Sequence, residues 1–269
     1  MTLEVKKIYV DSRYRTVSSN SDSDFSIQLS RNIYLPENCV MHIENCVIPH
    51  SWYTIEKDVN DKMYFIMNGD SQDYFVLTIP SSNYTGAQLV AALNRLLING
   101  LTATYELNTN RITISCPTPS QDAHHISLDS FQVLTDYELL HIFGISNPSS
   151  CNDIITNRTT KINTLDSPWI SGMINLQGFR SVYISSSTLC SYNTLGPQGE
   201  QNIIKKVSTN ADFGYLIIDH VVSDHDYLSC ERMTLNTIGF QIRDVKGNLI
   251  PFHDSPVSFT IVFTIQSGH

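Results

Sequence analysis

The segment Val257-Ser-Phe-Thr-Ile-Val-Phe-Thr-Ile-Gln266 alternates apolar and polar side chains over most of its length. In an extended chain one face carries Val257, Phe259, Ile261, Phe263 and Ile265, and the other carries Ser258, Thr260, Thr264 and Gln266. A period of two residues is typical of a strand with one buried face. The segment therefore predicts a half-buried strand near the C-terminus.

The same alternation occurs in a second segment towards the C-terminus and at the N-terminal end of the chain. Thr237 to Arg243 places Ile238, Phe240 and Ile242 on one face, and Asp24 to Leu29 does so with alternate apolar residues. Further strand candidates are Lys7–Val10, Val40–Ile48, Phe179–Ser185, Ile203–Val207 and Tyr215–Val221. The two ends of the chain therefore predict at least seven strands, which we expect to be antiparallel.

The middle of the chain has a different pattern. Thr85 with Gln88, and Thr135 with Glu138, have the spacing of a helix capping box, so each threonine predicts the start of a helix. Asn99-Gly100 and Gly144 are the corresponding stop signals. Strand pairs are predicted on either side of Asn68-Gly-Asp70 and of Asn108-Thr-Asn110, at Lys62–Met67, Tyr74–Ile79, Thr102–Leu107 and Arg111–Cys116.

These patterns predict a chain dominated by β structure, namely a single jelly-roll β-sandwich with a small inserted α+β subdomain of order ββαββα. Jelly rolls use about eight strands in two sheets. Residues 1–55 would hold an N-terminal arm and the first strands, 56–165 the inserted subdomain, and 166–269 the remaining strands. The sandwich can then close only when the C-terminal part of the chain returns to the N-terminal part.

The composition excludes several classes of protein. The 269 residues include 17 basic and 26 acidic side chains, a net charge of −9, so we expect no direct binding to nucleic acid. Charged residues are only 16%, which argues against a coiled coil. No apolar run approaches the roughly 20 residues of a membrane span, and the first residues lack the apolar core of a signal peptide.

The six cysteines are scattered and form no CxxC pair, so we expect free, buried thiols in a protein made inside the cell rather than secreted. The common catalytic signatures GxSxG, HExxH and GxGxxG are absent, as is a phosphate-binding glycine loop. We therefore expect no enzymatic activity and no cofactor.

Three groups of metal-ligating or titratable residues were considered as sites. Cys39, His42, Cys46 and His50 share one predicted strand, where Cys39 should point away from His42 and Cys46. Asp219-His220 with Asp224-His225-Asp226 offers oxygen and imidazole ligands at a strand end, and His124-His125 could act as a pH switch. We expect ordinary strand and loop residues in all three groups, and hence no metal site.

One small group of charged residues stands out as a candidate interface. Arg13 and Arg15 lie on either side of Tyr14, just after Asp11, and arginine suits two-pronged pairing with a carboxylate. The stretch Ser18-Ser-Asn-Ser-Asp-Ser-Asp24 cannot bury itself and predicts an extended arm or a loop. Asp11, Arg13 and Arg15 are therefore candidate interface residues, with a solvated loop as the alternative.

An ordered series of short motifs runs along nearly the whole chain. The N-terminal motifs are Tyr9-Val-Asp-Ser-Arg-Tyr-Arg-Thr16, Ser23-Asp-Phe-Ser-Ile-Gln-Leu29, Ile33-Tyr-Leu-Pro36 and Val47-Ile-Pro-His-Ser-Trp-Tyr53. The later ones are Ile79-Pro80, Asn83-Tyr84-Thr85, Leu139-Leu140, Phe143-Gly144-Ile145, Phe213-Gly214, Leu235 to Phe240 and Asp244-Val-Lys-Gly-Asn248. This series resembles the minor capsid (penton) proteins of virophages and the related Polinton (Maverick) viruses.

The resemblance implies a structural protein without catalysis, five copies of which form a homopentamer at each fivefold vertex of an icosahedral capsid. It implies a double-jelly-roll major capsid protein as the surrounding partner and the virion as the location, after synthesis inside the host cell. In some members an extra domain interrupts the jelly roll. We expect the N-terminal arm, with Arg13 and Arg15, to reach neighbouring subunits or the underside of the shell, and the domain to fold without residues up to Asp24.

The main alternative is a carbohydrate- or receptor-binding jelly-roll virion protein. Its support in the sequence would be a solvent-facing aromatic side chain or a calcium loop. Trp52, Trp169 and the acidic region from His220 to Asp226 are the candidates. A hydrolase is a third reading, but no nucleophile constellation supports it.

Overall fold

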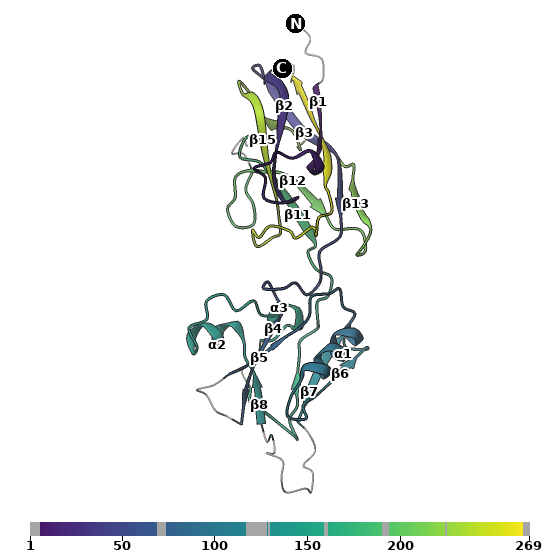
Figure 1. Cartoon of the computed structure of the whole chain (residues 1–269), viewed down its shortest axis with the longest axis vertical. Coiled ribbons are helices and arrows are strands. Elements are labelled where there is room, and N and C mark those ends of the chain that lie inside the picture. The colour runs from purple at the N-terminus through teal and green to yellow at the C-terminus, as the bar shows by residue number, and fades with distance from the viewer. Residues whose placement is uncertain are drawn as a thin grey trace. The chain divides into compact units, whose positions relative to one another are not determined.

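A computed structural model describes residues 6–68, 74–116, 128, 130–158, 161–189, 194–223 and 225–265. The chain is mostly β structure in several antiparallel sheets, with a few short helices (Figure 1). It divides into two compact units, each with its own apolar core. Unit 1 comprises Met1–Trp52 and Phe179–His269, and unit 2 comprises Tyr53–Gly178.

Unit 1 contains two antiparallel sheets, and each predicted terminal strand is present. The first has the order β1-β16-β3-β13, and β14 also pairs with β3. Its strands are β1 (Lys6–Asp11), β16 (Ser258–Ile265), β3 (Cys39–Pro49), β13 (Leu216–Asp219) and β14 (Leu228–Ser229). The second, of order β12-β11-β15-β2, contains β12 (Ile203–Ser208), β11 (Ser181–Ser185), β15 (Thr234–Arg243) and β2 (Asp24–Tyr34).

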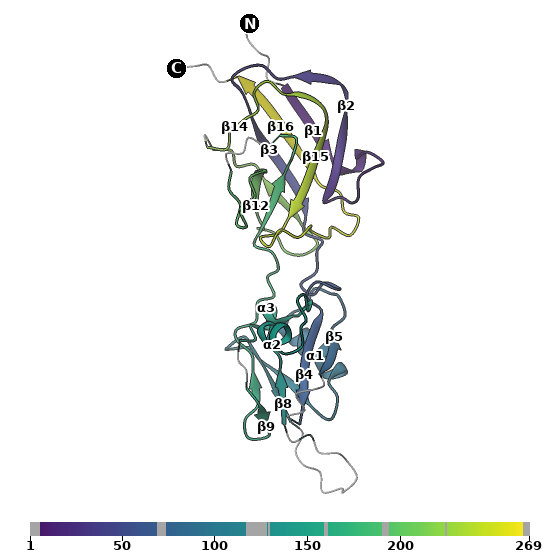
Figure 2. The same ribbon diagram turned by 90° about the vertical axis from the view of Figure 1, so that its left-hand side faces the viewer.

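The pairing of the eight longer strands of unit 1 is nested. β1 pairs with β16, β2 with β15, β3 with β13, and β11 with β12, all antiparallel. The first strand therefore lies beside the last and the second beside the second-last, as Figure 2 shows for β1 and β16 and for β2 and β15. Unit 2 is inserted between β3 and β11, the third and fourth strands of this series.

The two sheets of unit 1 share one core, as the alternating pattern predicted. Phe240 on β15 packs against Phe25 of its own sheet, with ring centroids 5.4 Å apart, and against Phe259 of the other sheet at 5.0 Å. The inward side chains of β16 are buried from Phe259 to Phe263. Burial of these large apolar groups is the main term that holds the sheets together.

Strand β3 departs from the strict alternation expected of it. Ile261 and Phe259 are two residues apart on β16, but their partners on β3, Ile43 and Cys46, are three residues apart. One extra residue in β3 is a β-bulge, and it exchanges the two faces of the strand. Cys39 and Cys46 consequently both lie in the core, so the prediction that they point in opposite directions was wrong.

Unit 2 contains two smaller antiparallel sheets and three helices. One sheet has the order β5-β4-β8-β9 and the other β10-β7-β6. The strands are β4 (Lys62–Met67), β5 (Phe75–Thr78), β6 (Thr102–Glu106), β7 (Arg111–Ser115), β8 (Ser130–Val133), β9 (Asn163–Thr164) and β10 (Trp169–Ile170). The helices are α1 (Gly86–Leu96), α2 (Asp136–His141) and α3 (Asn152–Ile155).

Both predicted capping boxes are formed. The side chain of Thr85 accepts from the backbone N–H of Gln88, and that of Thr135 accepts from the backbone N–H of Glu138. In turn, the side chains of Gln88 and Glu138 accept from the backbone N–H of the two threonines. The predicted hairpin of β4 and β5 is present, although Gly69 and Asp70 lie outside the described residues. Within the described part of the chain, no helix is long and apolar enough to span a membrane.

The structure corrects the predicted extent of the inserted part. The expected order ββαββα lacks β8, β9, β10 and α3, and the expected end at residue 165 is too early. β10 pairs with β7, and Trp169 and Ile174 lie in the core of unit 2, which extends to Gly178. β9 and β10 have only two residues each and show no periodicity, so the sequence contains no local signal that residues 166–178 belong to unit 2.

Candidate functional site

The candidate interface residues belong to a polar network at the end of β1, in which the chain turns through the short helix η1 (Ser12–Tyr14). Ser12 is fully buried and anchors this turn to the C-terminal part of the chain. Its N–H donates to the carbonyl of Val257 over 2.9 Å, and its hydroxyl accepts from the N–H of Val257 over 3.0 Å. We call Asp11, Ser12, Arg13, Arg15 and Asp22 the N-terminal polar network.

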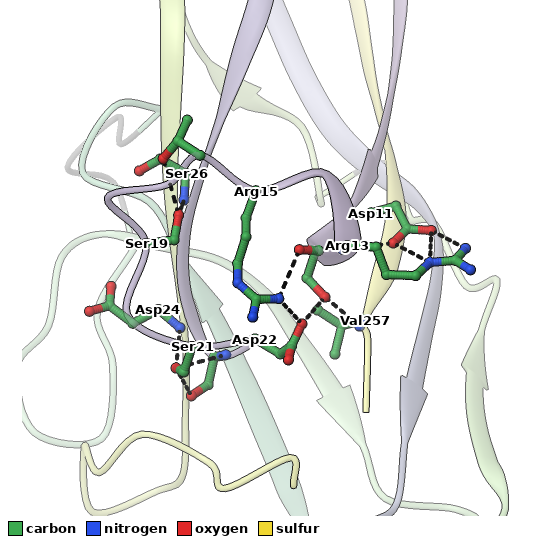
Figure 3. A network of polar contacts seen from close by, with 12 residues as sticks. Asp11, Arg13, Arg15, Ser19, Ser21, Asp22, Asp24, Ser26 and Val257 are labelled. Atoms are coloured by element: carbon green, nitrogen blue, oxygen red, sulfur yellow. Dashed lines mark hydrogen bonds and ion pairs between the residues drawn. The ribbon is translucent and has the colours of Figure 1, made fainter. Parts of the chain in front are cut away.

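Asp22 is the buried carboxylate of this network (Figure 3). It accepts a hydrogen bond from the hydroxyl of Ser12, and Nη1 of Arg15 donates to its Oδ1 over 2.8 Å. The same Nη1 atom also donates to the carbonyl of Ser12 over 3.2 Å. Arg15 therefore links Asp22 to the backbone of Ser12, and the charge of the buried Asp22 carboxylate is paired.

Arg13 makes a two-pronged pair with Asp11, two residues before it (Figure 3). Nε donates to Oδ1 over 3.0 Å and Nη2 donates to Oδ2 over 2.6 Å. This bonding holds the pKa of the Asp11 carboxyl below its ordinary value and raises the pKa of Arg13. The side chain of Arg13 is exposed, so the pair contributes little to stability, but it presents a fixed guanidinium at the surface.

The Ser/Asp stretch after η1 is an ordered turn, so the extended form of the predicted arm is wrong. The hydroxyl of Ser21 accepts from the N–H of Asp24 over 3.1 Å, and that of Ser19 accepts from the N–H of Ser26 over 3.0 Å (Figure 3). β1 carries the buried residues Ile8 and Val10. Deleting residues up to Asp24 would therefore remove β1 from its sheet, so we expect the remainder to be destabilised.

Replacing Asp22 with alanine is expected to destabilise unit 1 by about 1–3 kcal/mol, since it leaves the buried hydroxyl of Ser12 and the guanidinium of Arg15 without their acceptor. Urea denaturation followed by circular dichroism measures the change. Asp24→Ala is the control from the same turn: it removes the acceptor of Asn20 and Gln241 but leaves the bonds of Ser12 and Arg15 in place, so it should lose less stability. Equal stability of the wild type and Asp22→Ala would show that the network does not hold the turn.

The acidic group after β13 has a protein cation among its carboxylates. Nζ of Lys205 lies 3.6 Å from Asp219 and 3.9 Å from Asp226, and it donates to the carbonyl of Val221 over 2.6 Å. Nδ1 of His220 lies 2.6 Å from Oδ1 of Asn45. Asp224 lies outside the described residues. The buried ammonium of Lys205 thus lies beside both carboxylates and partly neutralises their charge.

No group of three His, Cys, Asp or Glu side chains within the described ranges is placed to hold a metal ion. In the stretch from Cys39 to His50, both cysteines are in the core, whereas the Nδ1 atom of His50 pairs with the carbonyl of Ala211 at 2.8 Å. The predicted pair His124-His125 lies outside the described residues.

His42 is buried on the outer side of β3, where its ring packs edge-on against Tyr227 with centroids 4.8 Å apart. Its Nδ1 atom has no hydrogen-bond partner among the described residues. Burial lowers the pKa of this imidazole from its ordinary value of 6.5. The neighbouring charges oppose one another, since Glu44 and Asp226 raise the pKa while Lys205 and Lys7 lower it.

Acidification below pH 6.5 is therefore expected to destabilise unit 1. The unfolded chain binds a proton at this histidine at a higher pH than the folded chain does, so stability falls as the pH passes down through 6.5 and levels off below the folded pKa. Free energies of unfolding from urea titrations at pH 7.5, 6.5 and 5.5 measure the effect. In His42→Gln the dependence should be weaker; an unchanged slope would assign it to other groups.

The aromatic candidates for sugar stacking are buried. Trp52 is 1% exposed in unit 1 and Trp169 is 2% exposed in unit 2, so neither ring offers a face to a ligand. Trp52 packs against His50, with centroids 4.3 Å apart, and against Phe179 at 5.8 Å. Both tryptophans are core residues, and the evidence expected for the carbohydrate-binding alternative is absent at these two positions.

Two solved structures match nearly the whole chain at low sequence identity. The chain matches the crystal structure of the mavirus penton protein with a TM-score of 0.49 and 10% sequence identity, over 97% of this chain and 99% of that one. It also matches a chain of the Sputnik virophage structure determined by cryo-EM, with a TM-score of 0.39 and 13% identity, over 96% and 98%. No family model and no curated protein matches the sequence.

Asp11, Arg13 and Arg15 are brought together at the surface of unit 1, but each arginine is paired with a carboxylate of its own chain. Sequence reasoning missed Ser12, Asp22 and Lys205. Asp22 is the carboxylate that pairs with Arg15, and Lys205 is the cation that pairs with Asp219. Of these residues, only Asp22 had a signal in the sequence, namely its spacing from Arg15 across a Ser-rich turn.

Proposed function

We propose that this chain is the penton, or minor capsid protein, of a virion in the virophage and Polinton (Maverick) lineage. Five copies would form a ring at each fivefold vertex, surrounded by a double-jelly-roll major capsid protein. The ordered motifs from Tyr9 to Asn248 support the proposal, and so does the architecture of the chain. The role is structural and requires no catalysis or cofactor.

The observation that carries the proposal is the nested strand pairing of unit 1. Its eight longer strands pair first with last, second with seventh, third with sixth and fourth with fifth. Such a chain is one long antiparallel hairpin that is folded into two sheets. An eight-stranded jelly roll would have this pairing, which supports the proposal. The insertion of unit 2 between the third and fourth strands also supports it, because the family resemblance implies an extra domain in some members.

The charge of the chain suits assembly in a shell. A net charge of −9 keeps free subunits soluble and apart, and it disfavours contact with the genome. A ring of five requires a heterologous contact, in which one face of a subunit meets a different face of the next. Arg13, held at the surface by Asp11, is available for such a contact or for the neighbouring major capsid protein.

Light scattering of the purified protein tests the proposal. We expect a mass of about five times the 30.3 kDa of one chain, and rings of five in negative-stain images. Because vertices can form only together with the shell, the same measurement is made after co-expression with a double-jelly-roll major capsid protein. A chain that forms no pentamer in either preparation, and that is absent from the vertices of particles, would overturn the proposal.

A receptor-binding role for unit 2 is the second candidate, and one pocket favours it. Tyr137, Asn152 and Arg158 line a pocket beside α2, with Asp136 and Asp153 on the same wall. An exposed aromatic ring beside planar polar groups suits the apolar face and hydroxyls of a sugar. Glycan-array binding that is lost in Tyr137→Ala and kept in Leu140→Ala would support this role; binding by neither wild type nor variant would exclude it.

A further inference from the structure

The edge strand β13 and the residues around it form an exposed apolar surface. Leu216 and Ile218 on β13 are 55% and 45% exposed, while Ile217 between them points into the core. Tyr215 and Val221, just before and after the strand, are also exposed. Natural edge strands are normally blunted by charge, proline or a bulge, and β13 has no proline or register shift and only the terminal charge of Asp219.

The opposite edge of the same sheet is β1, and it carries a second exposed surface. The sheet order β1-β16-β3-β13 leaves one side of β1 and one side of β13 without a paired strand among the described residues. On β1, Lys6, Lys7 and Tyr9 are exposed, and Tyr9 reaches 78%. Tyrosine is among the residues most often found at the energetic centre of protein interfaces.

The directions of the two strands allow the sheet to continue from one copy to the next. Each neighbouring pair in this sheet is antiparallel, so β1 and β13 run in opposite directions. If the next copy is placed with its sheet in the same orientation, its β1 meets β13 as an antiparallel partner. The outward side chains Lys7 and Tyr9 then lie on the same face as Leu216 and Ile218.

The charges of the two edges are complementary. β1 carries Lys6 and Lys7, and its one carboxylate, Asp11, is paired with Arg13, whereas the β13 edge is bordered by Asp212 and Asp219. Lys7 is also bonded to Glu44, and Asp219 lies near Lys205, so these charges are partly used within the chain. Exposed pairs contribute little affinity, but they disfavour contact between two β13 edges or two β1 edges.

We propose that β13 of one copy pairs with β1 of the next, so that the sheet runs on across the subunit boundary. This inference rests on the proposed pentamer, for which it names the contact. The contact is heterologous, as a closed ring requires, and main-chain hydrogen bonds would provide its geometry while Leu216, Ile218 and Tyr9 provide buried apolar area.

Cysteine cross-linking tests the contact directly. The double variant Tyr9→Cys with Ile218→Cys, oxidised after assembly, should give a ladder of covalent species up to the pentamer on a non-reducing gel. Tyr34→Cys with Ile218→Cys is the matched control, because Tyr34 is exposed at the end of β2 in the other sheet, and it should give no ladder. Dimers from Ile218→Cys alone would indicate twofold β13 pairing and overturn the inference.

A charge placed on the edge gives an independent test. Ile218→Lys should raise the protein concentration needed for assembly by roughly tenfold or more. Val245→Lys, at an exposed apolar position in the turn after β15, is the control and should assemble normally. Circular dichroism verifies that both variants are folded.

The two proposals can fail separately. If the wild type forms pentamers, but Ile218→Lys assembles equally well and the Tyr9–Ile218 cysteine pair gives no ladder, this inference is overturned and the penton proposal stands. If the wild type remains monomeric alone and with the shell protein, both are overturned.

Discussion

Phe240→Ala is expected to lower the free energy of unfolding of unit 1 by about 3–5 kcal/mol. The ring is almost completely buried and lies between Phe25 of its own sheet and Phe259 of the other. Its removal takes apolar area out of the core and leaves a cavity that two fixed sheets cannot fill. A loss of this size is a large part of the stability of an ordinary domain.

Tryptophan fluorescence can follow this unfolding because each unit contains one of the two tryptophans. Trp52 belongs to unit 1, so urea titration in a Trp169→Phe background reports on the sandwich. Phe240→Leu is the control and should lose much less, since it keeps most of the apolar volume. A loss below about 1 kcal/mol for the alanine variant would mean that the two sheets are not held by a shared core.

The eight longer strands of unit 1 could be predicted because each one has one face in the core, whereas the two-residue strand β14 was not predicted. That alternation is a local property, visible in six to ten residues such as Val257 to Gln266. The nested pairing could not be predicted in the same way, because the register of Phe240 against Phe25 joins residues more than 200 positions apart. The bulge in β3 is also set by its partner strand, so the face of Cys46 was predicted wrongly.

The candidate site was predictable to the extent that its contacts are local. The sequence singles out Asp11 and Arg13, two residues apart, but it predicts a carboxylate partner for Arg13 across an interface, whereas the structure pairs the two within the chain. The anchor of the same turn is Ser12 with Val257, across 245 positions, and nothing in the sequence marks it. Likewise, the carboxylates Asp219 and Asp226 suggested a cation site, but the cation is the ammonium of Lys205 from another strand.

Trp169 shows why the end of the inserted part was placed too early. The strand that contains it, β10, has only two residues, and Ile170 beside it is exposed. A single buried side chain has no period, so its assignment to unit 2 depends on pairing with Thr113 and Ile114 of β7. Trp169 is the large apolar side chain that β10 buries in the core of unit 2.

Trp169→Ala is therefore expected to destabilise unit 2 by about 3–5 kcal/mol, through the loss of a large buried ring and of the packing that holds β10 against β7. Hydrogen–deuterium exchange with mass spectrometry measures this unit by unit. Amides of β6, β7 and β10 should exchange much faster, whereas those of β15 and β16 should keep their protection because unit 1 has its own core.

Trp169→Phe is the matched variant, and it should retain most of the protection because an aromatic ring still fills the site. Faster exchange in both units of Trp169→Ala would contradict the division at Gly178, since it would mean that the two cores unfold together. Unchanged exchange around β7 would instead mean that residues 166–178 are not part of the folded inserted unit. The exchange rates of Trp169→Ala thus test whether the inserted unit extends to Gly178.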